Sequence, residues 1–272
     1  GTLFLCFKGV DYKAHVFVNG MFVGSHEGFF APFEFDITAF VSKGTNALVI
    51  TVENDAVCQS NSSWEGGEFR EGDKIYAATG LGYDDPEVGW HHCPPGMGIY
   101  QDVYIEARPT LHISDIFVRP LLADRQAEVW AEVFNTTPSS RDASLTVDVY
   151  GQNFERTVVT GMPASFPSSL GPGPNLVRIP VPIPNPRAWT PDTPWLYQAQ
   201  VRLYPDPSAS PCDVQTCTFG LRSFEMDETS ERKGEFRLNQ KPIRLRGANT
   251  MGHLQQCVVQ KDWDQLRDDI LI

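Results

Sequence analysis

The stretch Gly234-Glu-Phe-Arg-Leu-Asn-Gln-Lys-Pro-Ile-Arg-Leu-Arg-Gly-Ala-Asn249 decides how the rest of the chain is interpreted. Apolar and polar residues alternate on both sides of Asn239-Gln240-Lys241-Pro242, which predicts a small hairpin that leads into a strand over residues 243–248. A helical pattern then begins at Asp262, which has the spacing of a capping box with Gln265. Three apolar residues fall on one face of this helix: Trp263, Leu266 and Ile270.

A strand followed by a helix is one unit of an α/β repeat. A barrel of eight such units needs roughly 250 residues, and the sequence reaches only Ile272. We therefore expect residues 226–272 to be the incomplete start of a (β/α)8 barrel, and the chain to be a piece of an enzyme.

The charge balance narrows the class of partner. The 272 residues include 22 Lys and Arg against 34 Asp and Glu, which gives a net charge of -12. This balance argues against nucleic acid and against a membrane as partners, and it favours a neutral partner. No apolar run approaches the roughly 18 residues of a membrane span. No charged and then apolar leader precedes the strand-like Thr2-Leu3-Phe4-Leu5, so we expect the natural N-terminus to lie upstream.

The six cysteines form no CxxC pair and no even framework, so free buried thiols are expected and the cellular compartment stays open. They are Cys6, Cys58, Cys93, Cys212, Cys217 and Cys257. Asn61-Ser62-Ser63 and Asn135-Thr136-Thr137 match the glycosylation sequon, a short pattern that carries weight only in a secreted protein.

Before Gly234 the chain alternates apolar and polar residues at period two, which predicts a mainly β protein in two blocks. In the first block, Asn19-Gly20 is a strong hairpin signal between two strands. Residues 56–97 then form a long irregular segment rich in Gly, Pro, Asp and aromatic residues. Segments of this length are usually functional or disordered, and the aromatic residues favour an ordered one.

The second block begins near Pro109. Its short strands are separated by Pro, Gly and Ser clusters, which is typical of an immunoglobulin-like β-sandwich. The apolar alternation runs through residues 113–118, 129–133, 145–149, 177–183 and 197–203.

Five landmarks follow one another along nearly the whole chain. They are Val18-Asn19-Gly20 with Pro32-Phe33-Glu34-Phe35-Asp36, Gly98-Ile99-Tyr100-Gln101-Asp102-Val103, Trp189-Thr190-Pro191 with Trp195-Leu196-Tyr197, Phe219-Gly220-Leu221-Arg222, and Leu245-Arg246-Gly247-Ala248-Asn249. In this order they resemble glycoside hydrolase family 2, the family of β-galactosidases, β-glucuronidases and β-mannosidases. The resemblance implies a jelly-roll-like sugar-binding β-sandwich over 1–108, an immunoglobulin-like β-sandwich over 109–225, and the first β/α unit of a truncated catalytic TIM barrel over 226–272.

The resemblance also implies retaining hydrolysis of glycosidic bonds by two carboxyl groups about 5 Å apart. In this family both glutamates lie on later barrel strands, so no residue of this chain is assigned a catalytic role. The acidic run at Glu225, Asp227, Glu228 and Glu231 is interpreted as a solvated connection between domains.

The chain would then be the non-catalytic front of a retaining exo-glycosidase, with a carbohydrate substrate and its own barrel as partners. Assembly as a homo-oligomer stays open. The alternative from a different class is a stand-alone carbohydrate-binding or adhesion module. The predicted barrel start favours the glycosidase.

Substrate contacts are expected from Asn249 and His253, since barrel sites lie at the C-terminal ends of strands. Relatives usually carry Arg-His-Glu after this Asn, whereas this chain has Thr250-Met251-Gly252, so the resemblance does not imply which sugar is bound. His26 also matches a family landmark, and we interpret it as structural.

A second contact is expected just before Gly98, where galactosidase-like relatives carry an aspartate and this chain carries His92. Trp90 could stack on a sugar ring, and His92 could bind a hydroxyl or carboxylate. Packing of this segment between domains is an equal alternative. A metal site at His91, His92 and Cys93 ranks lower, because adjacent residues rarely point at one ion and no fourth ligand is evident. We therefore expect neither a metal nor a cofactor.

Overall fold

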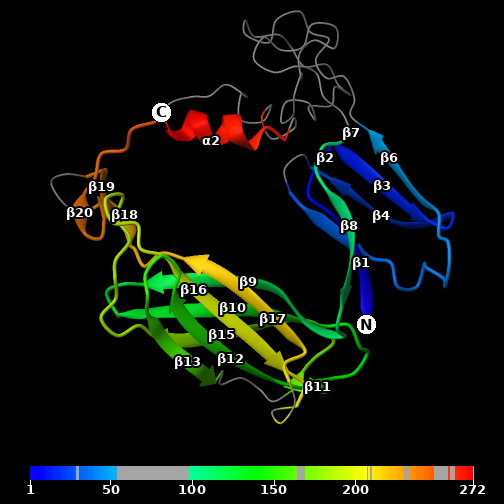
Figure 1. Cartoon of the computed structure of the whole chain (residues 1–272), viewed down its shortest axis with the longest axis horizontal. Helices are drawn as coiled ribbons and strands as arrows, with labels where there is room; N and C mark the ends of the chain where they lie inside the picture. Colours follow the sequence, from blue (N-terminus) through cyan, green and yellow to red (C-terminus); the bar gives the residue numbers. More distant parts are fainter. Residues whose placement is uncertain are drawn as a thin grey trace, which may run out of the picture. The chain divides into compact units, whose positions relative to one another are not determined.

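The structure, a computed structural model, describes residues 1–28, 31–53, 98–163, 169–206, 208, 210–229, 233–247, 257 and 261–271. Almost all of its regular structure is β, as predicted (Figure 1). The elements are β1 (Thr2–Phe7), β2 (Val10–Asp11), β3 (Lys13–Val18), β4 (Met21–Glu27), β5 (Phe33–Asp36), β6 (Leu48–Glu53), β7 (Gly98–Ile99), β8 (Val103–Arg108), β9 (Leu111–Leu121), β10 (Gln126–Asn135), β11 (Arg141–Asp142), β12 (Ser144–Gly151), β13 (Thr157–Pro163), β14 (Ser169–Leu170), β15 (Gly173–Pro182), β16 (Tyr197–Tyr204), β17 (Asp213–Phe219), β18 (Phe224–Asp227), β19 (Glu235–Leu238), β20 (Lys241–Pro242) and α2 (Trp263–Leu271).

The chain divides into two compact units. One contains Thr2–Ala107 with Gly247–Ile272, and the other contains Arg108–Arg246 with Gly1. We call the β-sandwich within Thr2–Ala107 the first sandwich and the one that begins at Arg108 the second sandwich. The predicted domain limits of 1–108, 109–225 and 226–272 stay a prediction.

The first sandwich is built from a sheet of order β4-β3-β6 and a sheet of order β5-β1-β8. Its hairpin turns at Asn19-Gly20 as predicted, with φ of 51° and 80°, the left-handed conformation that a two-residue turn requires. The Asn19 side chain also accepts a hydrogen bond from Ala47 N at 2.9 Å, which fixes the loop before β6. The core between the sheets consists of Leu5, Phe7, Val10, Ala14, Val16, Val18 and Ile37.

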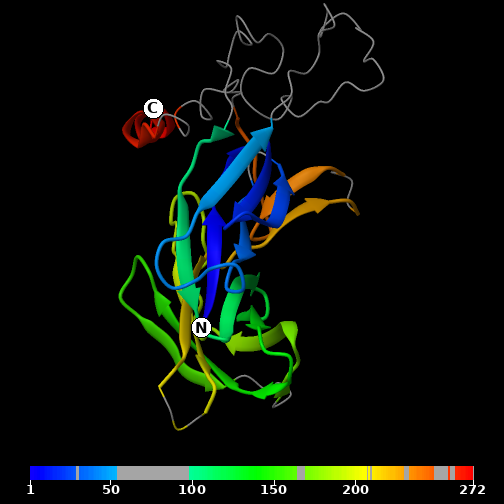
Figure 2. The same ribbon diagram turned by 90° about the vertical axis from the view of Figure 1, so that its right-hand side faces the viewer.

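The second sandwich packs a sheet of order β15-β10-β9 on a sheet of order β13-β12-β16-β17 (Figures 1 and 2). Three strands facing four is the arrangement of an immunoglobulin-like domain. Tyr197 opens β16 fully buried, and its hydroxyl accepts a hydrogen bond from Arg187 N at 2.7 Å. This contact resembles the tyrosine corner of immunoglobulin-like folds, so the predicted sandwich is confirmed.

After the second sandwich the chain forms a three-stranded sheet of order β18-β19-β20. Its β19–β20 pair is the hairpin predicted around Asn239. The strand predicted over 243–248 is wrong across the described residues 243–247, since Ile243 N donates to Phe236 O and no described strand pairs with residues 244–247. Extended backbone without ladder partners is not a stable strand. The acidic connection is also wrong in its first half, because Glu225 and Asp227 lie on β18.

The predicted N-terminus of α2 is confirmed. Gln265 N donates to Asp262 Oδ1 at 3.0 Å, which caps the helix. The reciprocal half of the capping box does not form, because Gln265 Nε2 donates to Asp269 and Asp262 N donates to Cys257 O. No described strand follows β20 before α2, so a barrel start stays a prediction.

The described cysteines and Asn135 of the second sequon are part of the packed structure. Four cysteines are free thiols, buried or half-buried as predicted, and Cys58 and Cys93 lie outside the described residues; the four are Cys6, Cys212, Cys217 and Cys257. The side chain of Asn135 is buried and donates to Ser139 O and Leu170 O, so its amide is occupied by the fold. None of the described helices is long and apolar enough to cross a membrane.

Candidate functional site

The four residues predicted to contact a sugar all lie outside the described residues. Trp90 and His92 fall within 54–97, and Asn249 and His253 fall within 248–256. The structure does describe the residues that flank both segments, and those residues define the frame of the candidate site.

Both ends of segment 54–97 are attached next to β2. Tyr12 N donates to the carbonyl of Glu53, the last residue of β6, at 3.4 Å. On the far side of the segment, Gly98 of β7 pairs with Asp11. Gly98 has a φ of 111°, a conformation that glycine adopts without strain. Two adjacent residues therefore hold the described residues on both sides of the segment: Asp11 at the end of β2 and Tyr12 just after it. Attachment of this kind is how a rigid scaffold positions a functional segment.

An ion pair connects this frame to the C-terminal part of the same compact unit. Lys261 Nζ lies 2.9 Å from Asp102 Oδ1, just before α2. The hydrogen bond and the charge of Lys261 lower the pKa of Asp102. The sequence pattern had placed Asp102 in a landmark, but no signal pointed to Lys261 as its partner. The ion pair therefore links a residue that follows segment 54–97 to a residue that follows segment 248–256.

The landmark around Tyr100 packs against the first sandwich. A Cβ atom added to Gly9 would lie 2.5 Å from the Tyr100 ring, so only glycine leaves room for this ring. Burial raises the pKa of Tyr100. The residue thus has a packing role beside the ends of segment 54–97.

His26 lies in the aromatic part of the first sandwich. Its ring stacks on Phe33 with centroids 4.1 Å apart, and Phe33 stacks on Phe7 at 4.6 Å. Its Nε2 atom is buried and has no hydrogen-bond partner. Burial lowers the pKa of His26, which favours a neutral ring. These contacts fit the structural role predicted for it.

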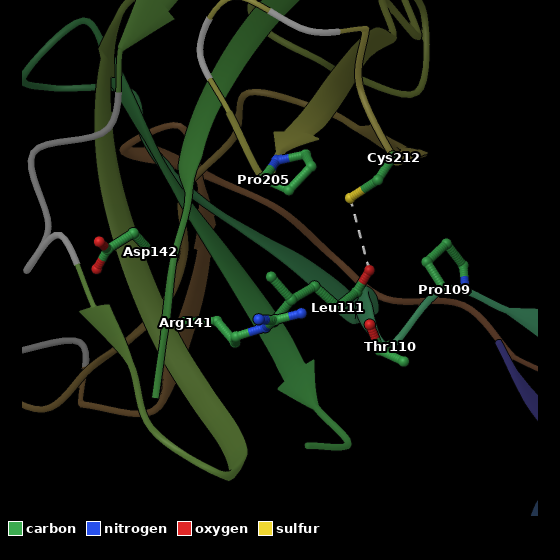
Figure 3. A pocket seen from close by; sticks show the side chains of 7 residues that line it. All are labelled: Pro109, Thr110, Leu111, Arg141, Asp142, Pro205 and Cys212. Atoms are coloured by element: carbon green, nitrogen blue, oxygen red, sulfur yellow. Dashed lines mark hydrogen bonds between the residues drawn. The ribbon is translucent and has the colours of Figure 1, made fainter. Parts of the chain in front are cut away.

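The second sandwich contains a pocket of about 390 Å³, drawn in Figure 3. Cys212 Sγ donates to Leu111 O at 3.6 Å, and burial raises the pKa of this thiol, so it is poorly suited to act as a nucleophile. Arg141 and Asp142 come from one strand and point in opposite directions (Figure 3). Across the described ranges no cluster of His, Cys, Asp or Glu could hold a metal ion. The pocket therefore offers no catalytic set.

Two landmarks and Asn239 of the predicted hairpin meet where the chain leaves the second sandwich. Trp189 N donates to Leu221 O at 2.9 Å, and the Arg222 guanidinium lies 4.8 Å from the centre of the Trp189 ring. Asn239 Nδ2 donates to Trp189 O at 2.9 Å, and Asn239 Oδ1 accepts from Ser223 N at 3.0 Å. We call the contacts among Trp189, Ser223 and Asn239 the Asn239 clasp. It fixes the sheet β18-β19-β20 to the second sandwich.

Comparison with known proteins agrees with the order of the two sandwiches along the chain. The sequence model "Glycosyl hydrolases family 2, sugar binding domain" matches residues 1–85, and the model "Glycosyl hydrolases family 2" matches residues 111–222. A β-galactosidase of Priestia megaterium is 27% identical over 252 residues, which cover 91% of this chain and 21% of that protein. A β-galactosidase of Thermoanaerobacter pseudethanolicus is 28% identical over 282 residues, which cover 98% of this chain and 33% of that protein. The chain thus spans about a fifth to a third of these relatives.

Solved structures share the fold. A Bacteroides uniformis β-glucuronidase matches with a TM-score of 0.64 and 24% identity, over 90% of this chain and 27% of that one. A β-galacturonidase from Eisenbergiella tayi, bound to galacturonate, matches with a TM-score of 0.62 and 21% identity, over 91% of this chain and 37% of that one. With two models of one family matching in sequence order over most of its length, this chain belongs to glycosyl hydrolases family 2.

Proposed function

We propose that this chain is the non-catalytic N-terminal part of a retaining exo-glycosidase that hydrolyses glycosidic bonds in carbohydrates. The observation that carries the proposal is the match of the family's sugar-binding domain and of the domain after it, in a chain that covers only 21% and 33% of two β-galactosidases. The remaining length of such relatives leaves room for a catalytic barrel of roughly 250 residues.

Retaining hydrolysis needs one carboxylic acid to protonate the leaving oxygen and a carboxylate about 5 Å away to attack the anomeric carbon. In this proposal both carboxyl groups belong to later barrel strands, and residues 226–272 begin that barrel. The two sandwiches of this chain position the barrel and contribute sugar contacts to its mouth.

The proposed sugar contacts are Trp90, His92, Asn249 and His253. Trp90 offers an apolar face for a sugar ring, while the other three offer hydrogen bonds to hydroxyl or carboxylate groups. The ion pair between Asp102 and Lys261 supports the proposal, since it joins residues that follow closely on both segments.

An activity assay tests the reaction. The 272-residue chain should hydrolyse no nitrophenyl galactoside, glucuronide or mannoside, while the complete polypeptide should hydrolyse at least one with retention of anomeric configuration, followed by proton NMR. Turnover by the purified short chain above a contaminant control, or inversion by the complete polypeptide, would contradict the proposal.

Substitution tests the contacts. In the complete polypeptide, Trp90→Ala and His92→Ala should each lower kcat/KM by about five- to thirty-fold, since lost stacking and hydrogen bonds of this kind cost about 1–2 kcal/mol. The melting temperature should change little. Trp130→Ala is the matched control for kcat/KM, because this tryptophan lies on β10 in the other compact unit. Lower stability with unchanged kcat/KM would favour the packing alternative.

A further inference from the structure

The outer side of the sheet β15-β10-β9 carries a row of large side chains. Trp130 of β10 pairs with Arg178 of β15 and with Phe117 of β9, and all three alternate along their strands with buried residues of the core. The Phe117 and Trp130 rings meet edge to face at 5.6 Å, and the Arg178 guanidinium lies 4.3 Å from the centre of the Trp130 ring. Phe117 is 53% exposed, and Leu176 in the next row is 54% exposed.

Charged residues flank this row on both sides. Glu128 pairs with Arg119 across the ladder on one side, and Glu132 pairs with Asp115 on the other. Arg119 Nη1 lies 3.9 Å from Glu128 Oε2. Together with Arg178, the surface holds two positive and three negative side chains, in a chain whose net charge is -12. It therefore adds little repulsion when two copies of the chain meet.

We call this outer side of the sheet the Trp130 face. It consists of Asp115, Phe117, Arg119, Glu128, Trp130, Glu132, Leu176 and Arg178.

The β15 edge of this sheet is closed to the addition of a strand. β15 is the outermost strand on its side of the sheet order. Its residues Pro174, Pro180 and Pro182 have no N–H group to donate to a further strand. Association on this side of the second sandwich therefore uses the face of the sheet and not this edge.

The composition of the Trp130 face suits a protein better than a sugar. Trp130 is not available for stacking on a sugar ring, because Arg178 lies over its ring and its Nε1 donates to Glu128 Oε2 at 2.6 Å. Leu176 adds an aliphatic surface with no ring to stack on. Trp, Phe and Arg in the centre with a charged rim is the composition of protein–protein interfaces.

The size and the charges of the face select a second copy among protein partners. Its strands are 10 and 11 residues long, which gives a footprint of roughly 34 Å by 14 Å. Protruding side chains bring the accessible area of such a footprint near the ~800 Å² that each partner buries in a standard interface. In a two-fold dimer the same patch meets itself, and a charged patch can do so when it carries both signs.

We propose that the Trp130 face is a self-association surface, through which two copies of this chain form a two-fold symmetric dimer. The inference does not depend on the proposed function. The face lies within Arg108–Arg246, whereas the predicted sugar contacts belong to the other compact unit. Variants of the face should therefore leave kcat/KM unchanged, which is why Trp130→Ala serves as a control for the sugar contacts.

Sedimentation velocity of the 272-residue chain tests the proposal. An interface of standard size gives a Kd on the order of micromolar or tighter, so a dimer should form above about 10 μM. Phe117→Glu should weaken self-association at least about ten-fold, because it places an unpaired charge in the centre of the interface. Phe22→Glu is the matched control, since Phe22 lies on β4 of the first sandwich and is 55% exposed.

Charge reversal gives a second readout that a misfolded variant would not produce. The double variant Arg119→Glu with Arg178→Glu makes the face wholly acidic, and Glu128→Lys with Glu132→Lys makes it predominantly basic. Each should be a monomer alone, and a mixture of the two should form a one-to-one heterodimer. Circular dichroism and thermal unfolding check that each variant is folded.

Three results would overturn the proposal. The first is a chain that remains a monomer at about 200 μM, far above the expected Kd. The second is a dimer that Phe22→Glu weakens as much as Phe117→Glu does, or a mixture of the charge variants that stays monomeric although both are folded. The third is a monomer that binds a soluble neutral galactan and loses this binding in Phe117→Glu, which would assign the face to a carbohydrate.

Discussion

The two sandwiches treat their buried polar groups differently. In the second sandwich the carboxylate of Asp148 is almost fully buried and accepts hydrogen bonds from Arg202, Tyr150 and Gly161. In the first sandwich the buried Nε2 atom of His26 has no such partner and rests among aromatic rings. A fully satisfied hydrogen-bond network is rigid and sensitive to the loss of one member, whereas an aromatic stack tolerates exchange of similar rings.

This difference matches the proposed roles of the two regions. The second sandwich supports the Asn239 clasp, which holds the sheet β18-β19-β20. The first sandwich attaches both ends of segment 54–97, whose residues Trp90 and His92 are proposed sugar contacts. Removing one polar group should therefore cost most in the second sandwich.

The largest effect is expected for Asp148→Ala. Removing the carboxylate leaves the Arg202 guanidinium and the Tyr150 hydroxyl without their acceptor, which should lower the free energy of unfolding by about 3 kcal/mol. Urea denaturation measures this change. Asp206→Ala is the control, because that carboxylate is exposed and, among the described residues, is shown to bond to Ser208. Similar losses for both variants would remove the distinction between the two kinds of site.

The stability of the Asp148→Ala variant should also depend less on pH in the acid range. Burial by itself raises the pKa of Asp148, but hydrogen bonds from Gly161, Arg202 and Tyr150 outweigh it and lower this pKa below its usual value of 3.8. The stabilisation is present above that usual value and is lost as pH falls through the lower folded pKa. Asp148→Ala should therefore flatten the acid limb of the stability curve.

The next effect concerns Asn239, which makes the clasp and has a φ of 51°. Asn239→Ala loses two hydrogen bonds and places alanine in a left-handed conformation, so stability should fall by about 2–3 kcal/mol. Asn239→Gly tolerates the backbone conformation and should recover part of the loss. Thermal unfolding, together with hydrogen exchange at the β18–β20 amides, measures both variants. If glycine and alanine behave alike, the backbone conformation contributes little.

A smaller, pH-dependent effect is expected at His26. Its folded pKa lies below the usual value of 6.5, so the unfolded state binds a proton more readily and stability falls as pH drops through and below 6.5. His26→Phe keeps the stacking and removes the titrating group. The melting temperature should then change less between about pH 7.5 and about pH 5.5. His15→Gln is the matched control, and an unchanged pH dependence in His26→Phe would contradict the burial argument.

The smallest effect is expected at the exposed pair of Asp102 and Lys261. Exposed ion pairs add little to global stability, so Lys261→Met should not shift the melting temperature measurably. It should raise hydrogen exchange at the amides of α2, because the pair attaches the residues just before this helix. Lys8→Met is the control, since Lys8 Nζ lies farther away, at 3.9 Å from Asp102. Unchanged exchange in α2 would show that other contacts hold the helix.

Much of the fold was predictable because strands and turns depend on neighbouring residues. The alternation in β3, β10, β12, β15 and β16 and the turn at Asn19-Gly20 are found as expected. One irregularity shows the limit of such patterns. In β9 the apolar positions change parity between Ile113 and Ile116, because Ser114 is an extra residue opposite Glu132 and Val133 and donates to Glu132.

The candidate site was less predictable. The sequence nominated Trp90, His92, Asn249 and His253 through a family resemblance, and all four lie outside the described residues. It also assigned Glu225 and Asp227 to a solvated connection, whereas pairing with β19 makes that segment a strand. Charged residues at every second position indicate a solvent-exposed connection when only the sequence is known. The pairing with β19 shows that this segment is a strand.

The sequence by itself determined the class of the protein, its strand-forming segments, its tightest turn and the helix start at Asp262, because each of these depends on residues a few positions apart. Only the tertiary structure decided which distant groups meet. Asn239 reaches Trp189 across 50 positions, and Lys261 reaches Asp102 across 159. Such contacts form because the two hydrophobic cores bring together residues that are far apart in the sequence. A local pattern of hydrophobicity does not show which distant residues meet.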